Sequence, residues 1–159
     1  MGSGRRVSVV VTVVAMLLVG GVTAAAAKPS PKAVFSAHVR AIGTQAQKAL
    51  LAMPAAVAPT QTESAAMADQ LRAIYARVAQ RLATLTPPKA IKGDFRILVA
   101  SYRASAKNAA AWRDALLHGT TAEAAAASKT LNNGLQNYRA SLALVRMSQE
   151  GYYFGTFYH

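Results

Sequence analysis

The stretch IKGDFRILVASYRASAKNAAAWRDALL, from Ile91 to Leu117, decides the fold of this chain. Its mostly apolar stripe returns at steps of three or four residues, which is the spacing of one face of an α-helix. The stripe consists of Ile91, Phe95, Leu98, Tyr102, Ser105, Ala109, Trp112 and Leu116. Two prolines close the segment before it and Gly119 closes the segment itself, so the sequence predicts one long amphipathic helix here.

Three further segments repeat this helical spacing. Together with the first stretch they predict helices at about residues 31–53, 61–85, 90–118 and 121–149. The connections are short and no strand pattern occurs, which predicts an all-α fold, an antiparallel bundle of about four helices spanning residues 28–150. An Asn-Asn-Gly run at residues 132–134 lies inside the last helix, and we expect a kink there.

Capping residues mark the ends of these helices. Thr60 and Glu63 precede the second helix, and Thr120 and Glu123 precede the fourth. Each pair fits a capping box, in which a hydroxyl at the N-cap is followed three residues later by a carboxylate. Gly119 follows the third helix and is expected to adopt a left-handed conformation after it.

The first 27 residues predict a secretory signal peptide. A pair of arginines precedes the apolar run Val7–Val22, and the small residues after it allow cleavage after Ala25 or Ala27. The alternative is an uncleaved membrane anchor, but the run is shorter than the about 20 apolar residues that a spanning helix needs. We therefore expect a secreted or extracytoplasmic protein of the cell envelope.

The mature chain is strongly basic and lacks cysteine. After Ala27 it carries 16 of the 18 lysines and arginines and all six acidic residues, a formal charge of +10. Without cysteine the domain must hold together by packing alone in an oxidising compartment. The missing thiols also exclude cysteine catalysis, iron–sulfur clusters, thiolate zinc sites and covalently attached haem.

The residues that carry catalysis or bind metals are scattered. The three histidines, His38, His118 and His159, lie on different segments, and none has a second ligand one helical turn away. The six acids do not form a pair with catalytic spacing, and neither a nucleophile elbow nor a Gly-rich phosphate loop occurs. The sequence therefore predicts a protein that is not an enzyme, with no metal and no cofactor.

Positive charge is the most specific chemical signal that remains. On the predicted third helix four basic side chains fall within one narrow sector, and two on the second helix are candidate neighbours: Lys92, Arg96, Arg103 and Lys107, with Arg77 and Arg81. Such an excess favours anionic lipid headgroups or acidic envelope polymers, although it also serves solubility alone. Nucleic acid is not the expected partner, because the chain is predicted to be exported and no nucleic-acid-binding motif occurs.

The tail, residues 151–159, is unusually aromatic. Its aromatic residues are Tyr152, Tyr153, Phe154, Phe157 and Tyr158. The preferred interpretation is that the tail folds back over the open end of the bundle. The alternatives are insertion at a membrane interface and recognition of a protein partner.

Two other functions remain open from the sequence. The bundle can sequester a small apolar ligand, or a haem held by a methionine and His38, between its helices. Alternatively, the chain associates with itself through small residues of the third helix, namely Ala100, Ala104, Ala111 and Ala115.

The segment Leu82-Ala-Thr-Leu85-Thr-Pro87-Pro88, followed by an amphipathic helix and the Gly119-Thr-Thr break, carries a resemblance. It resembles small exported bacterial helical proteins of unknown function, which have a signal peptide and a Leu-x-x-Leu-x-Pro-Pro hinge between two long helices. The resemblance covers roughly Leu71–Val145. It implies a helical fold and export, and it offers no catalytic residue. Those proteins often carry a cysteine pair, which this chain lacks.

Overall fold

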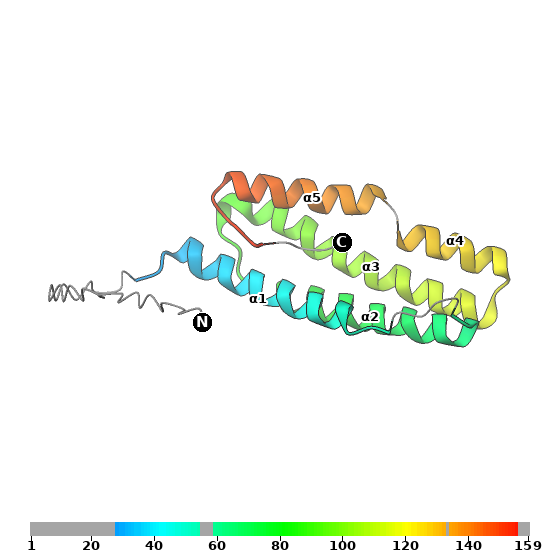
Figure 1. Cartoon of the computed structure of the whole chain (residues 1–159). Coiled ribbons are helices and arrows are strands. Elements are labelled where there is room, and N and C mark those ends of the chain that lie inside the picture. The colour runs from blue at the N-terminus through cyan, green and yellow to red at the C-terminus, as the bar shows by residue number, and fades with distance from the viewer. Residues whose placement is uncertain (1–27, 55–58, 133, 156–159) are drawn as a thin grey trace, which may run out of the picture.

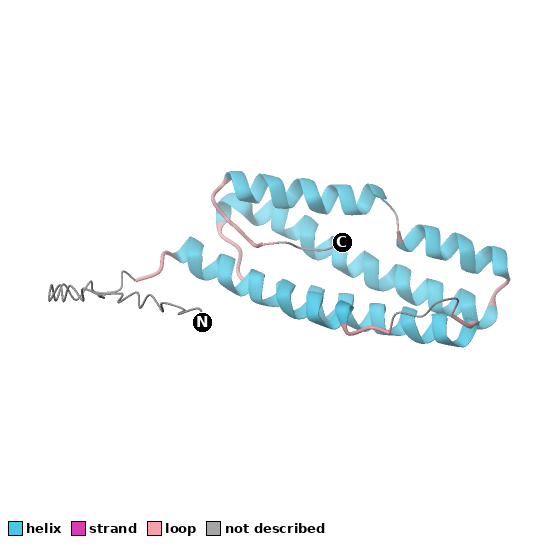
Figure 2. Ribbon diagram, in the orientation of Figure 1, coloured by secondary structure: helices cyan, strands magenta, loops and turns pink. Residues whose placement is uncertain are grey.

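Helices and short connections make up the whole described part of the chain, and no strand occurs in it (Figure 2). The structure is a computed structural model that describes residues 28–54, 59–132 and 134–155. Its elements are α1 (Pro31–Leu51), α2 (Gln61–Ala83), the 3-10 turn η1 (Lys89–Ile91), α3 (Lys92–His118), α4 (Thr121–Leu131) and α5 (Gly134–Gln149). The predicted all-α class is confirmed. The predicted signal peptide, residues 1–27, lies outside the described residues.

The described residues form five helices where the sequence predicted about four, because the segment 121–149 forms two consecutive helices. The break falls at the expected Asn-Asn-Gly run. The Asn132 amide Nδ2 and backbone N–H both donate to the carbonyl of Ser128, each at 3.1 Å, and so cap the end of α4. Glycine weakens a helix interior by about 1 kcal/mol relative to alanine, so Gly134 favours a new start over continuation.

From α1 to α4 each helix runs opposite to the one before it, and α5 continues in the direction of α4 (Figure 1). Helix α2 runs back along α1, and α3 runs back along α2. Helices α4 and α5 then follow one another along α3, which contacts α2, α4 and α5. None of the helices in the described ranges is both long and apolar enough to cross a bilayer.

The predicted stripe of α3 is the centre of the core. Its members Phe95, Leu98, Tyr102 and Ala109 are buried, and Ile91 is buried in the turn just before the helix. All of these except Ala109 pack with apolar residues of α1, α2 and α5, among them Val39, Val78, Leu82, Ala143 and Met147. Helix α4 contributes no fully buried residue to this core.

The cap predictions are confirmed for both capping boxes. The hydroxyl of Thr60 accepts from the Glu63 N–H at 3.2 Å, while the Glu63 carboxylate accepts from the Thr60 N–H at 2.8 Å. Thr120 and Glu123 repeat this geometry at 3.2 and 2.7 Å. These reciprocal bonds satisfy N–H groups that a helix start otherwise leaves without partners.

The prediction for Gly119 is wrong, because its backbone is extended rather than left-handed, with φ −99°. Close approach explains the glycine instead. A Cβ at this position would lie 2.8 Å from the carbonyl oxygen of Ala115 and 3.0 Å from the Glu123 carboxylate. The chain does use a left-handed glycine at Gly151, with φ +81°, where it turns out of α5.

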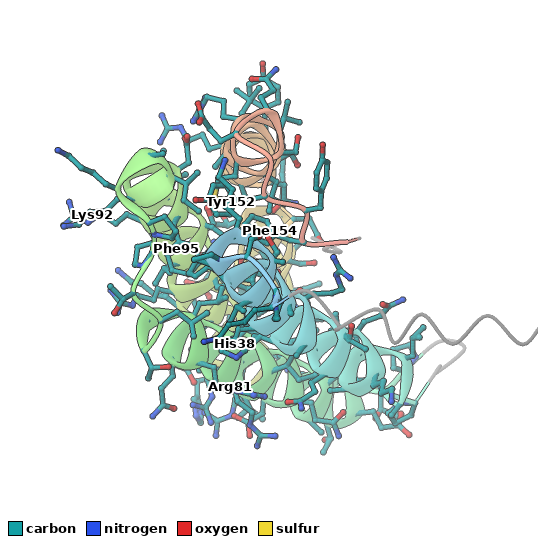
Figure 3. All side chains as sticks on the ribbon, turned by 90° about the vertical axis from the view of Figure 1, so that its left-hand side faces the viewer. His38, Arg81, Lys92, Phe95, Tyr152 and Phe154 are labelled. Carbon is teal, nitrogen blue, oxygen red and sulfur yellow. The ribbon has the colours of Figure 1, made fainter. Side chains whose placement is uncertain are left out.

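The tail returns from α5 and packs against α1 (Figure 3), and its residues Tyr152 and Phe154 belong to the same buried cluster as Phe95 of α3. The ring of Phe35 on α1 lies 5.3 Å from Phe95, 6.1 Å from Tyr152 and 6.2 Å from Phe154, centroid to centroid and edge to face. Tyr152 and Phe154 are only 3% and 5% exposed, whereas Tyr153 is 65% exposed. The tail therefore completes the core at the start of α1.

Two basic side chains of α1 hold the tail backbone. Lys32 Nζ donates to the carbonyl of Glu150 at 2.8 Å and lies 5.2 Å from the centre of the Tyr152 ring. Arg40 donates to the carbonyl of Tyr153 at 3.1 Å. These bonds satisfy carbonyls of a segment that is not helical, and the ammonium over the ring adds a cation–π attraction.

We expect Tyr152→Ala to lower the free energy of unfolding by about 3 kcal/mol, because truncating a buried aromatic ring leaves a cavity. Urea unfolding followed by circular dichroism measures the change. Tyr153→Ala removes the neighbouring exposed ring and is the matched control, with an expected change within about 0.5 kcal/mol. Equal losses in the two variants would contradict the burial of Tyr152.

Candidate functional site

Four basic side chains form a straight row on the outer side of α3. Lys92, Arg96, Arg103 and Lys107 are all exposed, and at 3.6 residues per turn they fall within a sector of about 60°. The neighbouring member of this sector, Val99, is buried, so the row lies along the edge where α3 meets the rest of the fold. Figure 3 shows Lys92 projecting away from the core at one end of the row. These residues are hereafter the α3 row.

Five of the six acidic side chains bind other partners, and no ion pair involves the α3 row among the described residues. Glu63 and Glu123 cap helices, and Asp69 pairs with Arg72 and lies 3.8 Å from Arg113. Asp94, on α3 itself, accepts from Arg146 of α5 at 2.7 Å. Asp114 accepts from its neighbour Arg113 at 3.2 Å. The row therefore carries four positive charges that nothing in the described fold neutralises.

Arg77 and Arg81 lie in a different groove. They line a cavity of about 60 Å³ between α1 and α2, together with Ile42, Gln45 and Val78. Arg81 also donates to the side chain of Gln45 on α1. Figure 3 shows Arg81 on the side of the molecule where His38 lies, and its side chain projects in another direction than that of Lys92. The structure thus brings the four cations of α3 together and separates this pair from them.

A polar cavity of about 140 Å³ was not foreseen from the sequence. It lies beside the break between α4 and α5 and is lined by Leu71, Tyr75, Ser101, Tyr102, Ser105, Leu131, Asn132 and Asn137. The rings of Tyr75 and Tyr102 lie 6.3 Å apart. Burial raises the pKa of Tyr75, and burial together with the charge of Tyr75 raises the pKa of Tyr102, so both phenols stay protonated at neutral pH.

One sequence signal pointed toward this polar cavity. Tyr75 and Tyr102 stand at apolar positions of their helices, and serines flank Tyr102 on the same side of α3. The asparagines reach the cavity only because α4 ends at Leu131, which the helical spacing alone does not show.

Three cavities of the described fold are small compared with the apolar ligand or haem considered as an alternative. A third one, of about 160 Å³, lies against Pro54, Glu63 and Met67. Pockets for drug-sized ligands begin at about 300 Å³, which exceeds the volume of each of these cavities. Of the methionines that a haem could use, Met147 is fully buried in the core and Met53 and Met67 are half-buried, while His38 is exposed at the surface.

The aromatic tail divides into buried and exposed positions. Tyr152 and Phe154 belong to the core, so a partner does not reach them in this fold, whereas Tyr153 is accessible. Phe157 and Tyr158 lie outside the described residues. The burial of Tyr152 and Phe154 agrees with a tail that folds back onto the bundle, as the preferred interpretation of the sequence has it.

Clustered metal ligands are not found: the described ranges contain no group of three or more histidine, aspartate or glutamate side chains that could hold an ion. A search of known protein families, of curated proteins and of solved structures gave no match to this chain.

The two capping boxes predict a pH dependence of stability. Hydrogen bonds from the backbone N–H and then the hydroxyl of Thr60 lower the pKa of Glu63 below 4.5, and Thr120 lowers that of Glu123 in the same way. A carboxyl whose pKa is lower in the folded state stabilises the fold above its unfolded pKa, and that contribution disappears as the pH falls through the folded value.

We therefore expect the free energy of unfolding to fall as the pH drops below about 4.5, and to fall less steeply in the Glu63→Gln, Glu123→Gln double variant. Urea unfolding at a series of pH values measures both slopes. Glu150→Gln is the control, because the contact of Glu150 is made by its backbone carbonyl. Parallel curves for the double variant and the unmodified protein would contradict the assignment.

Proposed function

We propose that the chain is an exported antiparallel helical bundle that binds anionic surfaces of the cell envelope through the α3 row, without catalytic activity. The observation that carries this proposal is the set of four exposed cations, Lys92, Arg96, Arg103 and Lys107, for which the described fold provides no acidic partner. Most acidic residues of the fold are used in helix caps and in ion pairs with three other arginines. The side of α3 that carries the row therefore stays positively charged. Opposite charge on a partner then gives attraction and orientation.

The surface chemistry supports binding rather than solubility alone. Solubility needs positive charge anywhere on the surface, and mixed signs serve it equally well. The α3 row instead concentrates one sign along one helix. Arginine at two of its four positions adds the planar fork that holds phosphate or carboxylate oxygens through two hydrogen bonds.

Binding to anionic vesicles, at low and at high salt, tests this proposal. We expect the exported protein to sediment with anionic but not neutral vesicles, and to be released by salt, because exposed charges are screened. Each basic residue near such a surface contributes about 1 kcal/mol, so Arg103→Gln with Lys107→Gln should weaken binding roughly 30-fold.

Arg139→Gln with Lys129→Gln is the matched control for this pair. It removes the same two residue types and the same charge from exposed positions on α5 and α4. We expect the control to bind almost as tightly as the unmodified protein, with only a small loss from the lower net charge. Equal weakening in both double variants would show that total charge, not the α3 row, drives the interaction.

Export is tested separately, by the N-terminus of the protein recovered outside the cytoplasm. Cleavage after Ala25 or Ala27 gives a chain that begins at Ala26 or Lys28. N-terminal sequencing and intact mass distinguish these from the full chain. Recovery of the full chain in the membrane fraction would show that the N-terminal segment is retained as a membrane anchor and is not cleaved.

A further inference from the structure

We infer that the α3 row binds a linear polymer of phosphate groups without nucleobases, a chain of phosphodiesters or phosphoanhydrides, rather than the plane of a bilayer. This inference rests on the proposed function and names the partner class for the same site. It follows from the length of the row, its residue types and the side chains that surround it.

The α3 row is long and straight. Lys92 and Lys107 are fifteen residues apart on one uninterrupted helix, so the row extends about 22 Å at a rise of 1.5 Å per residue. The row is rigid because the opposite side of α3 is buried against three other helices. It ends at Asp114, the next exposed residue of this sector, whose negative charge marks the limit of the positive strip.

The order of arginine and lysine along the row also fits a chain of phosphates. Arg96 and Arg103 occupy the middle of the row and the lysines its two ends. A guanidinium can hold two oxygens of one phosphate at once, whereas an ammonium attracts phosphates as a point charge. A chain with phosphates at short intervals can place oxygens at all four positions without losing its linear course.

The surroundings of the row argue against a bilayer. Interfacial helices place tryptophan, phenylalanine or leucine beside their basic residues, so that apolar side chains enter the membrane. Here the exposed residues beside the row are Gly93, Ala100 and Ala111, while the exposed apolar residues of α3 lie farther round the helix, at Ile97, or past the end of the row at Asp114, at Leu117. Phe95 and Tyr102 of α3 are buried, and the half-buried Trp112 lies on the side of the helix opposite the row, so none of them offers a platform for stacking bases beside it.

The test compares partners at equal phosphate concentration, using the exported protein and long-chain inorganic polyphosphate, tripolyphosphate, a synthetic poly(glycerol phosphate), anionic vesicles and single-stranded DNA. Titration calorimetry or fluorescence anisotropy gives each affinity. We expect the two long phosphate chains to bind at least tenfold more tightly than tripolyphosphate, which is too short to reach all four cations. Whichever of the two long chains binds more tightly shows whether the row prefers phosphoanhydrides or phosphodiesters.

The salt dependence gives a second readout. For single-stranded polyanions the logarithm of the affinity falls by about 0.7 per phosphate neutralised for each tenfold rise in salt, so four contacts predict a slope near −3. A fourfold rise in salt should then weaken polyphosphate binding roughly 50-fold. Arg96→Gln should reduce the slope by about 0.7, and the control Arg139→Gln should leave it unchanged.

The outcomes separate this inference from the proposed function. If vesicles bind as tightly as the long chains and the α3 row variant Arg103→Gln with Lys107→Gln loses both, the function holds and the linear polymer is wrong. If tripolyphosphate binds as tightly as the long chains, the four cations of the row do not bind one chain along its length. DNA binding that exceeds both phosphate chains would identify a nucleic acid instead. If the row and control variants behave alike toward every anion, the proposed function fails as well.

Discussion

The division of α3 into a buried stripe and a charged row is the constraint on which the rest of the structure depends. Because one side of this helix packs against α2, α4 and α5, its other side is fixed in space and cannot turn inward. The same rotation that buries Phe95, Leu98 and Tyr102 therefore holds the basic side chains in water along a straight line. Without cysteine, nothing covalent maintains this arrangement, so core packing alone keeps the charged side in register.

The scarcity of acidic residues gives this division its chemical meaning. Most of the six carboxylates have a structural role, since two cap helices and three pair with Arg72, Arg113 or Arg146. A protein with more acids could have balanced the α3 row locally. Here the few acidic residues stabilise helix starts and contacts between helices. The basic residues that have no acidic partner then give the surface its positive charge. Surface charge and fold stability are thus linked through a shared and limited set of side chains.

Much of the fold follows from local sequence, and much of the site does not. Helical spacing and capping boxes act over four to seven residues, so α3, its buried stripe and its basic sector could be predicted from residues 91–117 alone. The packing of Tyr152 against Phe35 depends on a contact between segments far apart in the sequence, and the spacing of apolar residues does not predict such contacts. The same holds for Arg77, whose groove is set by how α1 lies on α2. Gly119 shows a third limit, because its role is a close approach to Ala115 that no turn rule describes.

The position of Tyr152 and Phe154 has a consequence for how the chain reaches its final state. Synthesis proceeds from the N-terminus, so Phe35 is made more than a hundred residues before the rings that cover it. Helices α2 and α3 are adjacent in sequence and can pair as soon as both exist. The start of α1 lacks its covering rings until the tail arrives, because contacts of long sequence separation form only after the intervening chain is in place. A nascent chain of this design stays incompletely folded until nearly all of it has been made, which is the state in which a polypeptide can be threaded through a narrow pore.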